Sequence, residues 1–134
     1  MELTKNFTES EFVVSKDYSA IASRIVLTDT EGIRLKLLCQ SIMQPLRDNV
    51  GAITILSGKR NDELNTLVGG TATSDHLTAN ACDFTCNRYL PDVYEDMKDA
   101  PYRQLILYPT FIHVSINIPG KRYKHERWIK DGQL

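Results

Sequence analysis

The sequence predicts one α+β domain in which helices pack on one face of a small antiparallel β-sheet. Apolar residues recur every three or four positions over 35–46, as on a helix, and alternate with polar residues over 111–118, as on a strand. A chain of 134 residues with 42% hydrophobic content can bury one core without disulfides. Because it contains no repeat, low-complexity segment or linker, we expect residues 1–134 to form a single domain.

Two helices are expected in the first fifty residues. Thr8 begins a short one, because Glu11 stands three residues later and completes a capping box. A longer helix opens at Asp29 and ends at Gly51, and Pro45 should bend or interrupt it. Its apolar positions follow helical spacing and are Leu35, Leu38, Ile42 and Leu46.

Shorter elements alternate along the remainder of the chain. We expect, in order, a strand over 52–56, a helix over 61–68 stopped by two glycines, a strand over 80–86, a helix near 91–99, and strands near 103–108 and 111–118. The last two strands are joined at Pro109 and Thr110, which predicts a tight antiparallel hairpin.

Two of these strands carry polar rows that contain candidate metal ligands. Alternate side chains share a face of a strand, so Asp83 lies on the polar face of one strand and His113 on that of the other. If the strands pair, both converge with His76, which arrives from the preceding loop. Two imidazoles and one carboxylate are a common ligand set for catalytic zinc. We therefore predict a zinc site at His76, Asp83 and His113; the alternative is an ordinary His–Asp hydrogen bond at a sheet edge.

The pattern Ser74-x-His76 followed by Ala81-x-Asp83 resembles the S-x-H-x-x-G-x-A-x-D signature of the zinc D-alanyl-D-alanine carboxypeptidase-like peptidases. This family includes phage murein endopeptidases and shares a fold with lysostaphin-type peptidases and the hedgehog domain. Further matches lie at 7–12 (F-S-x-x-E-F), 44–47 (P-L-R), 57–60 with Asn65 and 69–70 (S-G-Y-R…N…G-G), 104–106 (D-Q-L-I) and 112–115 (W-V-H-V-S). The resemblance implies a hedgehog-like and D-Ala-D-Ala peptidase-like fold with zinc as cofactor.

Three positions depart from the family pattern. Its signature glycine is Ala79, a mild change if that residue keeps a negative φ. Arg103 stands where the family usually has Asp, and Tyr108 stands where its glutamate resembles a general base. With an unperturbed pKa of about 10, tyrosine is a poor base at neutral pH but can donate a hydrogen bond to an oxyanion or a leaving amine. Other acidic candidates for proton transfer are Asp75, Glu126 and Asp131.

The resemblance also assigns substrate-binding residues. Arg60 is expected to grip a substrate carboxylate, because a planar guanidinium matches that group; the alternative is a surface ion pair with Asp62 or Glu63. Ser74 is expected to contact substrate or to hold the loop that carries His76, the alternative being a plain turn residue.

Two functions from different classes follow. The first is a zinc peptidase that cuts peptidoglycan peptides and is encoded by a phage or prophage, as a lysis enzyme or a virion component. The second is a catalytically impaired virion or wall-binding module that keeps the peptidase fold, because Tyr108 replaces the expected glutamate. A structural zinc site closed by His125 as fourth ligand is a third interpretation.

Composition limits partners and location. A net charge of −1 and a pI near 6.3 argue against nucleic acid, which requires a basic face. The basic stretch 121–127 is either a solvated tail or edge strand, or a rim that attracts an anionic cell-wall polymer. Three cysteines, Cys39, Cys82 and Cys86, imply no disulfide framework and read as small core residues.

The chain shows no apolar signal region at its start and no run of about 18 apolar residues, so neither a signal peptide nor a transmembrane segment is expected. We expect synthesis in the cytoplasm and action at the bacterial cell wall, after phage release or as part of a particle whose proteins would then be partners.

Overall fold

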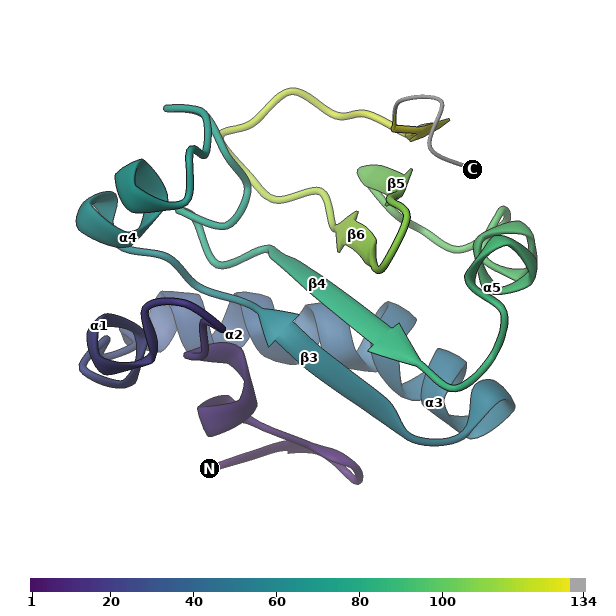
Figure 1. Ribbon diagram of the computed structural model, residues 1–134, viewed down its shortest axis with the longest axis horizontal. Coiled ribbons are helices and arrows are strands. Elements are labelled where there is room, and N and C mark those ends of the chain that lie inside the picture. The colour runs from purple at the N-terminus through teal and green to yellow at the C-terminus, as the bar shows by residue number, and fades with distance from the viewer. Residues whose placement is uncertain (131–134) are drawn as a thin grey trace.

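The computed structural model describes residues 1–130 and confirms an α+β fold (Figure 1). The strands in this range are β1 (Glu2–Thr4), β2 (Phe7–Thr8), β3 (Ile53–Ser57), β4 (Ala81–Cys86), β5 (Gln104–Leu107), β6 (Ile112–Ser115) and β7 (Glu126–Ile129). The helices are α1 (Ser19–Ser23), α2 (Asp29–Leu38), α3 (Gln44–Val50), α4 (Asp62–Leu67) and α5 (Leu90–Asp96), with a 3₁₀ turn at Glu9–Phe12 and a π-helical turn at Cys39–Met43.

The main sheet has the strand order β3-β4-β6-β5-β7 within residues 1–130. Its first four strands pair antiparallel, as predicted, whereas β7 pairs parallel to β5 and makes the sheet mixed. The predicted tight turn between β5 and β6 is present, since the Tyr108 N–H donates to the Phe111 carbonyl oxygen over 2.9 Å. The basic stretch at 121–127 thus runs into an edge strand, one of the two outcomes expected for it.

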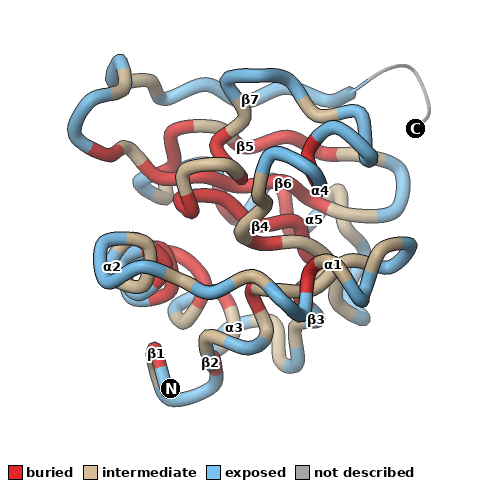
Figure 2. The backbone as a smooth tube through the Cα atoms, turned by 90° about the vertical axis from the view of Figure 1, so that its left-hand side faces the viewer, coloured by how far each residue is buried: buried red, intermediate tan, exposed pale blue. Residues whose placement is uncertain are grey.

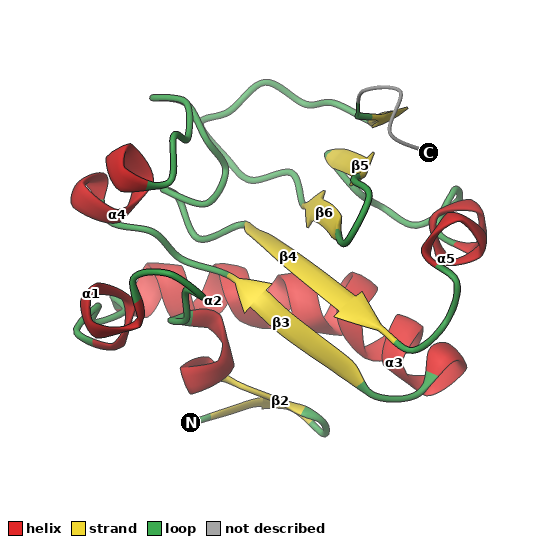
Figure 3. Cartoon of the chain, viewed as in Figure 1, coloured by secondary structure: helices red, strands yellow, loops and turns green. Residues whose placement is uncertain are grey.

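One face of the sheet is covered by α2, α3 and α5 (Figure 3). Apolar side chains of β4 and β6, including Phe84 and Val114, point toward Leu35 and Met43 of the long helical segment, and all four are fully buried. Figure 2 shows the buried backbone running through β4, β5 and β6, while β7 is exposed along its length. The polar residues of β4 and β6 therefore face the opposite side, where a cleft lies.

Pro45 interrupts the long helix in the manner expected. Proline cannot donate to the carbonyl four residues earlier and its ring crowds that group. The helix accommodates this with the π-helical turn at Cys39–Met43, after which Pro45 occupies the first turn of α3. The same segment begins with a capping box between Thr28 and Glu31, one residue before the predicted start.

Elements that the sequence did not predict are the β1–β2 pair, α1, and the parallel pairing of β7. Strands of two or three residues carry no readable periodicity, and β7 has few apolar residues. No helix in the described part of the chain has the length and apolar character needed to cross a membrane.

Candidate metal centre and substrate cleft

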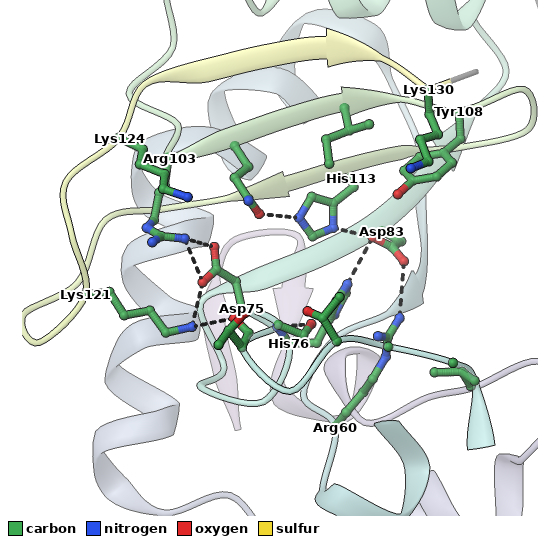
Figure 4. A pocket seen from close by; sticks show the side chains of 18 of the residues that line it. Arg60, Asp75, His76, Asp83, Arg103, Tyr108, His113, Lys121, Lys124 and Lys130 are labelled. Atoms are coloured by element: carbon green, nitrogen blue, oxygen red, sulfur yellow. Dashed lines mark hydrogen bonds and ion pairs between the residues drawn. The ribbon is translucent and has the colours of Figure 1, made fainter. Parts of the chain in front are cut away.

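The pairing of β4 with β6 places Asp83 directly opposite His113. His76 reaches the same point from the loop that precedes β4, and Figure 4 shows the three side chains converging. Oδ1 of Asp83 lies 2.8 Å from Nδ1 of His113 and 3.1 Å from Nε2 of His76. All three residues are buried, and one ligand atom from each lies within 4.8 Å of the others.

Hydrogen bonds on the far side of each ring orient the two imidazoles. Nδ1 of His76 donates to the carbonyl oxygen of Gly58 over 2.7 Å, which leaves the Nε2 lone pair facing Asp83. Nε2 of His113 donates to Oε1 of Gln104 over 3.3 Å, which leaves Nδ1 facing Asp83. Such contacts fix the tautomer and ring orientation of metal-binding histidines.

Asp83 is ionised at neutral pH despite its burial. Burial by itself raises the pKa of this carboxyl, but the charge of His76 and hydrogen bonds from both histidines hold the pKa well below its usual range. Two imidazole nitrogens and a carboxylate oxygen, each free to point at one common position, fit a divalent metal such as zinc. These three residues can therefore hold a metal ion. Since β4 and β6 are interior strands, the contact is not a hydrogen bond at a sheet edge.

Asp75 and Arg103 anchor the loop that carries His76. The Asp75 carboxylate accepts from Nη1 of Arg103 over 2.8 and 3.0 Å and from Nζ of Lys121 over 2.7 Å. Burial alone would raise the pKa of Asp75, but Lys121 and Arg103 lower it, so the group stays charged. A carboxylate held by two cations is a poor proton acceptor, which disfavours the proton-transfer role predicted for Asp75.

Arg60 and Ser74 lie on the cleft side of the same loop. Nη2 of Arg60 is 3.7 Å from Oδ2 of Asp83, and Nη1 donates to Oδ1 of Asn65 over 3.3 Å. Within residues 1–130, Arg60 makes no ion pair with Asp62 or Glu63, the alternative that the sequence left open. Oγ of Ser74 accepts from the backbone N–H of His76 over 3.2 Å and so supports the loop.

Tyr108 lines the cleft at the end of β5, with its ring stacked on Phe111 at a centroid distance of 4.4 Å. Burial and the nearby charge of Asp83 raise the pKa of Tyr108, so its hydroxyl stays protonated and acts as a donor. Glu126 is exposed and lies outside the cleft lining, while Asp131 lies outside the described residues. Among the residues that the structure describes, the cleft is lined by two carboxylates only, those of Asp75 and Asp83.

His125 and the cysteines take no part in the centre. The His125 ring stacks on Tyr102 and its Nδ1 donates to the Tyr102 carbonyl oxygen over 3.0 Å, so it does not close a fourth ligand position. Cys82 points into the core, where its Sγ lies 3.7 Å from Sδ of Met43. Cys39, Cys82 and Cys86 are all free thiols.

Three supporting residues were not identified as such from the sequence: Gly58, Gln104 and Lys121. Gln104 belonged to a family match, and strand alternation would have placed it on the face of Ile106 and Tyr108. Gly58 acts through its carbonyl oxygen, which has no sequence signal. Lys121 lies 46 residues from Asp75, beyond the reach of local patterns.

Comparison with known proteins agrees with this geometry. A family model described as Peptidase M15 matches residues 5–115, a span that contains the three candidate ligands, Arg60 and Tyr108. No curated protein matches the chain.

Proposed function

Because the chain belongs to the peptidase M15 family, we propose that it is a zinc-dependent peptidase-like domain that acts on bacterial peptidoglycan peptides. The observation that carries the proposal is the convergence of His76, Asp83 and His113 in the lining of one cleft. The cleft has a volume of about 750 Å³, within the range of small-molecule and peptide sites. Peptidoglycan as substrate, and a phage setting at lysis or on a virion, rest on the sequence resemblance and belong to the proposal.

Each residue of the cleft has a defined task in this proposal. The metal would be held by Nε2 of His76, the carboxylate of Asp83 and Nδ1 of His113. Bound zinc supplies an activated water and polarises the carbonyl of the peptide bond. Arg60, braced by Asn65, orients a substrate carboxylate through its planar fork. The Tyr108 hydroxyl donates a hydrogen bond to the developing oxyanion or to the leaving amine.

Proton transfer is the weak step of this site. A positioned general base contributes roughly 10²–10⁴-fold to the rate. Since neither Tyr108 nor Asp75 can serve as an efficient base, hydrolysis by this chain is expected to be slower than in a site with glutamate by about that factor. The same observation favours a second candidate function, a virion or wall-binding module that keeps the metal and the cleft but does not cut.

Zinc content by elemental analysis, combined with turbidity loss of purified peptidoglycan, tests both functions in the wild type, His113→Ala and Tyr108→Glu. Zinc bound by the wild type together with lysis that His113→Ala abolishes supports the peptidase. Bound zinc without lysis, and lysis that appears in Tyr108→Glu, supports the binding module. A wild type that neither binds zinc nor lyses peptidoglycan overturns both. Tyr108→Phe is the matched control, because it keeps the stacking on Phe111 and removes only the hydroxyl.

A further inference from the structure

Charge is strongly segregated on this molecule. The whole chain carries 16 basic and 17 acidic residues, a net charge of −1. Among the described residues, the cleft lining contains six cations against the carboxylates of Asp75 and Asp83. The cations are Arg60, Arg103, Lys121, Arg122, Lys124 and Lys130. A cleft with an excess of one sign concentrates ligands of the opposite sign.

Part of this positive charge is already balanced by the protein itself. Arg103 and Lys121 share Asp75, and Arg60 lies beside Asp83. Arg122 and Lys124 form no ion pair with any carboxylate of residues 1–130. Their side chains are available to a ligand in the cleft that both of them line.

The backbone that carries these two cations is held in place, although it lies outside helices and strands. The Lys124 N–H donates to Oδ1 of Asn117 and the Lys124 carbonyl oxygen accepts from Nδ2 of Asn117, each over 2.9 Å. Nε of Arg103 donates to the Arg122 carbonyl oxygen over 3.2 Å. Lys121 adds its contacts to Asp75 and to the Thr73 carbonyl oxygen. We refer to Lys121, Arg122 and Lys124 as the basic wall.

The basic wall and Arg60 lie on opposite sides of the candidate metal centre. In Figure 4, Lys121 and Lys124 lie on one side of His76 and His113, while Arg60 and Tyr108 lie on the other. A peptide that spans the centre with one carboxylate at Arg60 therefore places its more distant residues against the basic wall. Nucleic acid is disfavoured here because its affinity depends on neutralising many phosphates along a basic surface, and the positive charge is confined to this cleft.

We propose that the basic wall binds a second, free carboxylate of the substrate, so that the cleft selects acidic peptides with non-amidated side groups. The inference rests on the proposed function for its choice of a peptide ligand. Arg122 and Lys124 are the specificity-determining residues, and Lys121 keeps the wall in position through Asp75.

The test compares two fluorescein-labelled peptides, L-Ala-γ-D-Glu-L-Lys-D-Ala-D-Ala and the same peptide with the free D-Glu carboxyl amidated. Affinity is read as fluorescence anisotropy in the first minute, and cleavage is followed in the same samples by mass spectrometry. Two exposed ion pairs predict about tenfold tighter binding of the free carboxylate. Arg122→Gln with Lys124→Gln should remove that preference. Lys98→Gln should leave it unchanged, because Lys98 is exposed and lies outside the cleft lining.

Equal affinity of the wild type for the two peptides overturns the inference, as does a preference that survives the double substitution. Tighter binding of a ten-residue oligothymidylate than of the acidic peptide overturns it in favour of a phosphodiester ligand. A binding preference without cleavage keeps the inference while removing the peptidase. Cleavage of both peptides with equal affinity keeps the peptidase while removing the inference.

Discussion

Gly58→Ala is expected to weaken the fold and the candidate metal centre together. A Cβ at position 58 would overlap backbone atoms of Phe12, a fully buried residue whose carbonyl oxygen accepts from the Lys59 N–H over 2.8 Å. Neither backbone segment can move without breaking that contact. Gly58 also offers the carbonyl oxygen that orients His76, so any shift at position 58 is transmitted to the ring that faces Asp83.

The magnitude follows from these two contacts. Overpacking of this kind costs about 1–3 kcal/mol of unfolding free energy. In a domain of 134 residues this lowers the melting temperature by about 4–12 °C. Loss of the contact that orients a metal-binding histidine typically weakens metal affinity by about 10–100-fold. Thermal denaturation measures the first effect, and competition for zinc with a chromophoric chelator measures the second.

Gly32→Ala is the matched control and should have the opposite sign. Its added Cβ meets only the end of the flexible Glu9 side chain, and Gly32 lies within α2, where alanine is favoured over glycine by up to about 1 kcal/mol. The reasoning fails if Gly58→Ala keeps the wild-type melting temperature and zinc affinity, or if both substitutions have the same effect.

Three further predictions concern backbone strain, acid stability and thiol reactivity. Ala79 has φ of +59° and a fully buried methyl group, so Ala79→Gly should change stability by less than about 1 kcal/mol, whereas Ala79→Val should destabilise by more than 2 kcal/mol in urea titrations; equal effects would contradict the strain. Burial alone would raise the pKa of Glu31, but Lys59 lowers it below 4.5, so their pair stabilises the fold above that pH and is lost as the pH falls through the lowered pKa. Glu31→Gln should therefore cost about 1 kcal/mol at pH 7 and nothing near pH 3, and a constant difference would refute this. Iodoacetamide should label native Cys86 alone, since burial raises the pKa of Cys39 to about 12, and urea should expose all three thiols; mass spectrometry would detect labelling of Cys39 in the native state.

The faces of the strands were predictable because side-chain alternation is a local property of extended backbone. That rule placed Asp83 and His113 on polar faces, and the antiparallel hairpin after β5 was readable from Pro109 and Thr110. The bend at Pro45 followed from the missing proline N–H.

The conformation of Ala79 was not predictable in the same way. The family signature has glycine at this position, and a negative φ would have made alanine a mild change. The structure places Ala79 in the left-handed region, so the condition fails and the departure carries strain.

By itself, the sequence determined the fold class, the order of the main elements and the three residues that meet in the cleft, because periodicity and capping act within a few residues of one another. Only the tertiary structure decided that β7 pairs parallel to β5, that Asp75 is held by Arg103 and Lys121, and that unpaired cations line one side of the cleft. These contacts join residues 22 to 46 positions apart. Their partners are chosen by the packing of the whole chain, and no local pattern of side chains specifies them.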